Sequence, residues 1–370
     1  MKAPSYSGLA HAGLAHAGLA RVLALAAGLL LALASTDAFA LDIAGSGAAS
    51  PYPLYATWLD AYQKDTGTSL NMSFKLVGSG EGIRHITERS VDFGASDVPL
   101  SNTILEKDSL VQFPVAVSGV VPVVNIPGVK AGELKLTAKL IFQIYTGAIK
   151  RWNNPAIAEF NRNLRLPDLP IRPFGRSDGA GTTYHFTYYL AKADQDWNRK
   201  FGYGLKIDWP ATAVLVGSVK EMVAVMQGTP GAFGFLEYGS ASLNGIGMPQ
   251  LRNSDGMFVS PGLTTFRSAL GESSWRSKGA FEDMLADMPG STSWPITAGT
   301  YVIIPSNPAK HKEALQVLKF FTWCFMHGDR FVEHFGYMPL PDTVQARVAR
   351  QMVKVKDARG TPLIYVATKS

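Results

Sequence analysis

The chain has 370 residues, a formal net charge of +6 and a single cysteine. This length exceeds what one hydrophobic core usually covers, so two domains are expected. The basic residues are spread along the chain without a Lys/Arg block, which argues against a nucleic-acid partner. One cysteine cannot form an internal disulfide, and the apolar residues around Cys324 predict a buried, unreactive thiol.

Residues 1–40 have the pattern of a secretory signal peptide. Lys2 and Arg21 are the only charges before an apolar run at 22–34, and Ala38-Phe39-Ala40 follows as a small-x-small cleavage site. The run is shorter than the roughly 20 apolar residues that span a bilayer. We therefore expect cleavage after Ala40 and export across the cytoplasmic membrane into the periplasm.

Apolar periodicity alternates between strand and helix along the rest of the chain. Strands are expected at 41–44, 69–77, 91–95, 115–126, 171–175, 231–238 and 300–304, and helices at 53–64, 82–89, 138–145, 182–191, 218–227, 311–326 and 343–355. Ser218 and Glu221 form a capping box at one helix start. The nearly continuous apolar segment 115–126 is typical of a strand buried on both faces of a parallel sheet. The alternation predicts the α/β class with mixed, mostly parallel sheets.

Three glycine-rich segments each join a predicted strand to a predicted helix, at 44–51, 78–82 and 176–183. Ser50 and Thr182 are the expected N-caps of the first and third helices. The first N–H groups of a helix have no partner within it, and the helix dipole favours negative charge there. Three such helix starts in one chain predict a site for a tetrahedral anion. No segment matches the P-loop or the dinucleotide fingerprint.

Two charged positions sharpen this prediction. Arg176 lies in the third segment beside Asp178, so its guanidinium could bind anion oxygens while the carboxylate holds it in place. Asp97 follows a predicted strand, where an isolated aspartate is typically a turn or capping residue.

These segments resemble the phosphate-binding proteins of bacterial high-affinity phosphate ABC transporters. The matching residues are 45–51, 78–82, 91–97, 112–114, 124–128, 176–182, 230–234, 294–297 and 318–321. The resemblance implies a two-lobe periplasmic binding protein fold of type II, with the ligand cleft between the lobes. Lobe one would comprise residues 41–118 and 296–370, and lobe two residues 119–295. It also implies a monomer without cofactor or metal, which delivers inorganic phosphate to ABC transporter permease subunits in the inner membrane.

The resemblance also implies the residues that contact phosphate. They are Ala49, Ser50, Ser79, Asp97, Arg176, Ala180, Gly181 and Thr182, with Asp178 holding Arg176. Asp97 would accept a hydrogen bond from the proton that phosphate carries. The family usually has Thr-Phe where this chain has Ala49-Ser50, and Ser where it has Ala180. Two hydroxyl groups are therefore missing, although Ser50 could replace one if the loop shifts.

Other functions remain open at this point. A phosphatase needs metal ligands or an activated nucleophile, and the five histidines after residue 40 lack ligand spacing. His85 and His185 do lie near the glycine-rich segments. A binding protein for sulfate or molybdate is a second alternative, disfavoured by Asp97 because a carboxylate repels a fully ionised ligand. A phosphate-sensing paralogue is a third.

Overall fold

The computed structural model describes Met1 and residues 41–364. The predicted signal peptide and its cleavage site therefore lie outside the described residues. Within the described part, no helix is both long enough and apolar enough to cross a membrane.

Strands and helices alternate along residues 41–364. The strands are β1 (Leu41–Gly47), β2 (Leu70–Leu76), β3 (Phe93–Ser96), β4 (Leu110–Val124), β5 (Lys135–Leu136), β6 (Arg172–Arg176), β7 (Val214–Val216), β8 (Ala232–Glu237), β9 (Gln250–Arg252), β10 (Phe258–Val259) and β11 (Thr297–Pro305). The helices are α2 (Tyr52–Thr66), α3 (Ser79–Thr87), α4 (Asn102–Lys107), α5 (Ala138–Tyr145), α6 (Pro155–Phe160), α7 (Gly181–Ala193), α8 (Gln195–Lys200), α9 (Val219–Gly228), α10 (Tyr238–Leu243), α11 (Leu263–Gly271), α12 (Ser274–Ser277), α13 (His311–His327), α14 (Asp329–Val332) and α15 (Asp342–Met352), with a short 3-10 helix at Glu333–Phe335. The predicted α/β class is confirmed.

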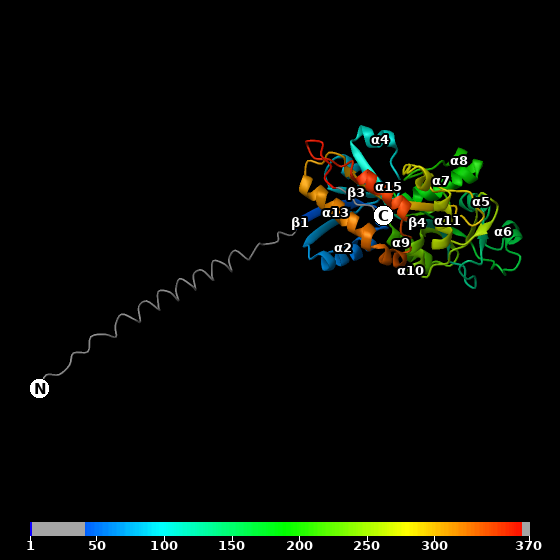
Figure 1. The fold of residues 1–370 in the computed structure, drawn as a ribbon. Coiled ribbons are helices and arrows are strands. Elements are labelled where there is room, and N and C mark those ends of the chain that lie inside the picture. The colour runs from blue at the N-terminus through cyan, green and yellow to red at the C-terminus, as the bar shows by residue number, and fades with distance from the viewer. Residues whose placement is uncertain (2–40, 365–370) are drawn as a thin grey trace. The chain divides into compact units, whose positions relative to one another are not determined.

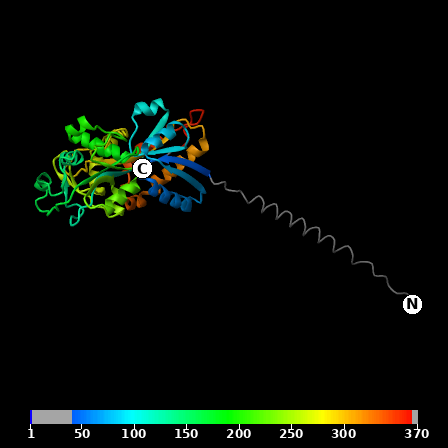
Figure 2. The same cartoon turned by 180° about the vertical axis from the view of Figure 1, so that it is seen from behind.

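Eight strands form one mixed sheet in the order β2-β1-β3-β11-β4-β8-β6-β7, and β10-β9-β5 form a smaller one. Strands β1, β2 and β3 pair in parallel, as do β8, β6 and β7. Segments from both chain ends gather around the first group, whereas the middle of the chain, green and yellow in Figure 1, surrounds the second. The view from behind shows the same division (Figure 2).

Strand β4 connects the two groups. Its first part, residues 110–119, pairs with β11, and its second part, Val120 to Val124, pairs with β8. Because β11 is antiparallel to both β3 and β4, strands β1 to β3 run in the same direction as β4, and β8, β6 and β7 run in the opposite direction. The two groups lie at different ends of β4, so their carboxyl ends face each other.

The prediction of a parallel neighbourhood for segment 115–126 is wrong. Every residue of β4 is buried, as expected, but both of its neighbours are antiparallel. Burial comes instead from helices packed on the strand, among them α7, α10, α11 and α15. A continuous apolar run reports burial on both faces, and burial alone does not fix the direction of the neighbours.

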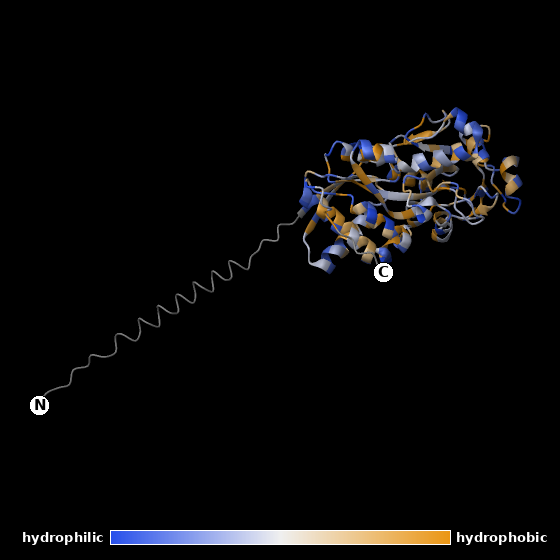
Figure 3. Cartoon of the chain, turned by 45° about the horizontal axis from the view of Figure 1, so that its top comes forward, coloured by the Kyte–Doolittle hydropathy of each residue, from blue (hydrophilic) through white to orange (hydrophobic). Residues whose placement is uncertain are grey.

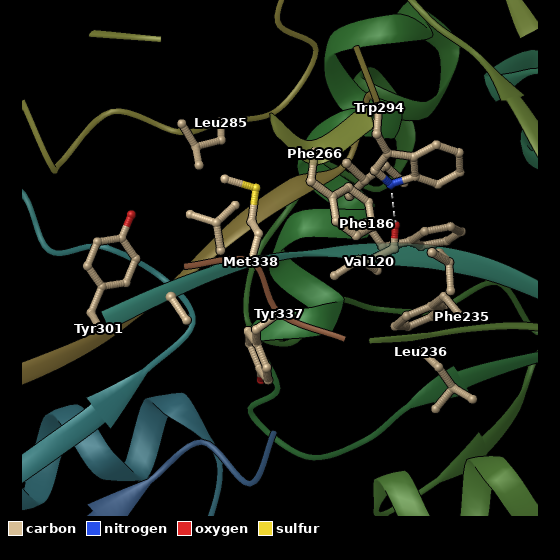
Figure 4. Packing of buried hydrophobic residues seen from close by; sticks show 14 of the residues in the cluster. Val120, Phe186, Phe235, Leu236, Phe266, Leu285, Trp294, Tyr301, Tyr337 and Met338 are labelled. Carbon is tan, nitrogen blue, oxygen red and sulfur yellow. Dashed lines mark hydrogen bonds between the residues drawn. The ribbon is translucent and has the colours of Figure 1, made fainter. Parts of the chain in front are cut away.

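The hydrophobic core runs through the point where β4 changes partner. Trp294, with no exposed surface, donates a hydrogen bond from its indole Nε1 to the carbonyl oxygen of Val120 at 2.9 Å (Figure 4). Phe186 and Phe235 stack beside them, with ring centroids 4.4 Å apart. Hydrophilic residues gather on the outer helices and loops, blue in Figure 3.

Most predicted elements agree with the structure to within a few residues, but helix α3 begins three residues earlier than expected. Gly78 has a φ of 85°, a left-handed conformation that favours glycine, so the chain turns into the helix at once. Ser79 is therefore in the first turn of α3 rather than in a preceding loop. At α9 the predicted cap is confirmed, since the Ser218 hydroxyl accepts a hydrogen bond from the Glu221 amide at 3.2 Å.

Candidate functional site

The structure brings all nine residues singled out from the sequence onto the wall of one cavity of about 580 Å³. They are Ala49, Ser50, Ser79, Asp97, Arg176, Asp178, Ala180, Gly181 and Thr182. They lie at or just beyond the carboxyl ends of β1, β2, β3 and β6, which is where ligands bind in open α/β sheets. The opposed directions of the two strand groups explain why loops far apart in sequence meet here.

Arg176, the last residue of β6, is the buried cation of the site; the exposed Lys220 also lines the cavity. Its side chain is 5% exposed, and Nε and Nη2 donate to the two carboxylate oxygens of Asp178 at 2.8 and 2.6 Å. The predicted pairing of these two residues is confirmed. The remaining nitrogen, Nη1, is buried and has no hydrogen-bond partner among the described residues. A buried guanidinium with one unpaired donor in a cavity wall is suited to an anion.

Asp97 faces the cavity from the end of β3. Its Oδ2 accepts a hydrogen bond from the Ser50 hydroxyl at 2.7 Å, and its amide donates to the Ser79 hydroxyl at 3.1 Å. Burial raises the pKa of the Asp97 carboxyl. The predicted N-cap role of Ser50 is wrong, because Pro51 occupies the N-cap position of α2 and the Ser50 hydroxyl is engaged with Asp97.

The start of helix α7 lies opposite Asp97. Ala180 occupies the N-cap position and makes no side-chain cap, so the predicted capping by Thr182 is wrong. Thr182 is in the first turn, and its Oγ1 is buried without a partner among the described residues. Uncapped amides and an unpaired hydroxyl therefore line this wall of the cavity.

The loops on the two sides of the cavity touch each other. The Gly80 amide donates to the Gly179 carbonyl oxygen at 3.3 Å. A Cβ atom at Gly181 would lie 2.7 Å from the Asp97 Cβ and 2.9 Å from the Ser79 Oγ. Glycine is needed at position 181 because no larger residue allows this approach.

Glu237, the last residue of β8, also lines the cavity and was not predicted from the sequence. Its Oε2 is buried without a partner among the described residues. Burial raises the pKa of Glu237 to about 7, against the nearby positive charge of Arg176, which lowers it. The sequence did contain a signal for this position. Glu237 directly follows the apolar run Phe233–Leu236, so it was expected at the end of a strand.

His185 of α7 lies behind Asp97. Its Nε2 is 2.5 Å from the Asp97 carbonyl oxygen, and His185 and Glu237 both line a small cavity of about 20 Å³. Burial lowers the pKa of His185 to about 4, so the imidazole is neutral at physiological pH.

Cys324 is buried, and burial raises the pKa of its thiol well above the usual value, as predicted for an unreactive core cysteine. Residues 41–364 contain no group of three or more His, Cys, Asp or Glu arranged to hold a metal ion.

Two facing groups of strands with a polar cavity at their carboxyl ends define the periplasmic solute-binding class, and residues 33–325 match the PBP superfamily domain. The chain is 37% identical to "Phosphate-binding protein PstS" of Pasteurella multocida over 339 residues, which cover 90% of this chain and 98% of that protein. It is also 37% identical to the protein of the same name from Haemophilus influenzae, with 84% and 92% covered. The chain belongs to this family of phosphate-binding proteins.

The fold is also that of solved structures. A high-affinity periplasmic phosphate-binding protein bound with phosphate, designated PfluDING, superposes with a TM-score of 0.66 at 21% identity, covering 84% of this chain and 93% of that one. The two-lobe fold expected from the sequence is therefore confirmed.

Proposed function

We propose that this chain is an extracytoplasmic substrate-binding protein that captures inorganic phosphate and delivers it to the permease of an ABC importer. The observation that carries the proposal is the buried Arg176 with its unpaired Nη1, which lines the same cavity as the half-buried carboxyl of Asp97. The names of its relatives support the same ligand. The family consists of solute-binding proteins, and we propose that this chain has no enzymatic activity.

Each side of the cavity would hold a different part of the phosphate ion. Arg176 Nη1, the Thr182 hydroxyl and the first amides of α7 supply donors for phosphate oxygens. Ser79 would add a hydroxyl group from the opposite side. The Asp97 carboxylate, which already accepts a hydrogen bond from Ser50, would accept another from the phosphate oxygen that stays protonated near neutral pH. Sulfate has no such proton, so the same carboxylate would repel it.

We propose lobe boundaries at 41–118 with 296–370, and 119–295. The change of partner along β4 between Gly119 and Val120 supports this division. The lobes would close on phosphate by bending at this point. Hinge closure around a ligand is a general property of periplasmic binding proteins. We also propose that the chain is exported to the periplasm with cleavage after Ala40, and that it is a monomer.

Calorimetric titration of the ligand-stripped protein tests the assignment. We expect phosphate to bind more tightly than sulfate, and Asp97→Asn to narrow that difference because the amide can donate to a fully ionised oxygen. Sulfate binding as tight as phosphate in the unchanged protein would contradict the proposal. A radius of gyration that does not change on saturation with phosphate would contradict the closure.

A further inference from the structure

Glu237 lies where the large cavity meets a second, much smaller one. It lines both, and the smaller cavity, of about 20 Å³, is also lined by Asp97, Thr182 and His185. A space of this size has room for about one water molecule, so the residues around it lie close together. Glu237 therefore belongs to the same corner of the site as Asp97 and the unpaired Thr182 hydroxyl.

One carboxyl oxygen of Glu237 takes no part in holding the fold together. Its Oε2 is buried and has no hydrogen-bond partner within residues 41–364. The residue occupies the N-cap position of α10, but its side chain does not cap that helix. The nearby Arg176 forms its ion pair with Asp178 instead. Because a buried polar atom without a partner is costly, this oxygen is suited to contact a ligand.

The charges around Glu237 disfavour its ionised form once an anion has entered. The charged and titratable groups around it are Arg176, Asp97, Asp178, Lys220, His185 and Tyr337. The last two are neutral at pH 7, because burial lowers the pKa of the imidazole and raises that of the phenol. The two cations and the three carboxylates, with Glu237 counted, carry a net charge of −1. A phosphate dianion adds two more negative charges, which favours protonation of one carboxyl.

Glu237 is the carboxyl that is best placed to bind this proton. Asp97 accepts a hydrogen bond from Ser50, and Asp178 accepts two from Arg176, so donors stabilise the ionised form of both. Oε2 of Glu237 has no such donor among the described residues. Burial raises the pKa of Glu237 to about 7 before any ligand binds, and a nearby anion raises it further. A protonated carboxyl can donate a hydrogen bond to a phosphate oxygen.

We propose that Glu237 is a further phosphate-binding residue, which takes up a proton from solvent when phosphate binds and donates a hydrogen bond to a phosphate oxygen. Asp97 and Glu237 then have complementary roles, because Asp97 accepts a hydrogen bond from the protonated phosphate oxygen and Glu237 donates one to an unprotonated oxygen. The inference rests on the proposed phosphate site and couples its ligand to a proton. The proton stays on Glu237, so no bond of the phosphate ion forms or breaks.

The test compares the unchanged protein with Glu237→Gln, in which a neutral amide replaces the protonated carboxyl and still donates. Phosphate is titrated into both proteins by calorimetry between about pH 6 and pH 9. The titration of phosphate itself is common to both and cancels from the ratio of their Kd values. We expect the Kd of the unchanged protein, divided by that of the variant, to rise up to about tenfold per pH unit above about pH 7, because only the unchanged protein must take up a proton. A ratio that does not change with pH would overturn the inference.

A second measurement counts the proton directly. At about pH 8, the binding enthalpy in buffers of different ionisation enthalpy gives the number of protons taken up with each phosphate ion. The unchanged protein should take up about one proton more than Glu237→Gln. Equal numbers in the two proteins would overturn the inference.

Glu221→Gln is the matched control, because it removes the same charge near the cavity. Glu221 is exposed on α9, and its Oε2 accepts a hydrogen bond from the amide of Gly217, which lines the cavity. This variant should keep the pH dependence of the unchanged protein. The same change in both variants would be an effect of net charge and would overturn the inference. Failure of phosphate to bind at any pH would instead refute the proposed function, because the inference concerns only how phosphate affinity responds to pH.

Discussion

Two arginines with carboxylate partners show how burial changes what a charge can do. Arg84 on α3 contacts Glu81 and Glu88, each at 2.7 Å, and its side chain is 51% exposed. Arg176 forms its one ion pair among the described residues with Asp178, and its side chain is 5% exposed. Water competes for every contact of Arg84, whereas Nη1 of Arg176 is buried and has no hydrogen-bond partner among the described residues. A buried donor without a partner, such as Nη1 of Arg176, therefore indicates a ligand site better than the number of ion pairs does.

The largest expected effect separates these two arginines. Arg176→Ala should weaken phosphate binding by about 2–5 kcal/mol, because the anion loses its charged partner in a desolvated cavity. In a titration this is roughly thirtyfold to several thousandfold in Kd. Arg84→Ala, the matched variant on the exposed network, should bind phosphate as the unchanged protein does. Equal losses in both variants would show that the ligand lies elsewhere, provided that thermal melts show both to be folded.

Two other buried groups, Glu237 and His185, should give pH dependences of opposite sign. The pKa of Glu237 is raised to about 7, so the folded state binds its proton more tightly, and stability is lost as pH rises from about 4.5 through 7. The pKa of His185 is lowered to about 4, so stability is lost as pH falls from about 6.5 towards 4. Each effect is up to about 3 kcal/mol.

Denaturant unfolding of the variants at a series of pH values checks these signs. The stability of the unchanged protein relative to Glu237→Gln should fall between pH 4.5 and 7. Relative to His185→Asn it should rise between pH 4 and 6.5. Any packing cost of a substitution is independent of pH and shifts the difference without changing its slope. Slopes of the same sign would refute the assignment for one of the two groups.

The smallest expected effect comes from adding a neutral hydroxyl donor at Ala180, at the start of α7. Ala180 is the uncapped N-cap of α7 and lines the cavity, with a φ of −89° and a ψ of 133° that a serine cap also adopts. Ala180→Ser should stabilise the protein by about 0.5–2 kcal/mol through capping. Its hydroxyl proton should also strengthen phosphate binding by about 1.5–3 kcal/mol. Melting and titration measure the two effects separately. A more stable variant with unchanged affinity would show that the hydroxyl does not reach the ion.

The parts that could be predicted from the sequence depend on neighbours in the chain. Helix α5 begins and ends where expected because Thr137 caps it and Gly147 follows its end. Arg176 and Asp178 are two residues apart, so their pairing was also predictable. Ser50 and Asp97 are 47 residues apart, and which role the hydroxyl takes depends on the loops meeting in space. Glu237 was missed for the same reason, because only the folded chain shows that its carboxyl faces the cavity.

The passage of β4 through the molecule has a mechanical consequence. Its residues are hydrogen-bonded to β11 up to Gly119 and to β8 from Val120 onward, and the Trp294 indole is fixed to the Val120 carbonyl. A bend at this point must twist a pair of hydrogen-bonded strands, because the two groups are not joined here by a flexible loop. A twisted strand stores elastic energy that increases with the deformation, and this energy favours the return to the open arrangement. The stiffness of the Gly119–Val120 segment, which lines a small cavity together with Asp97 and Thr182, would then set how quickly the molecule reopens.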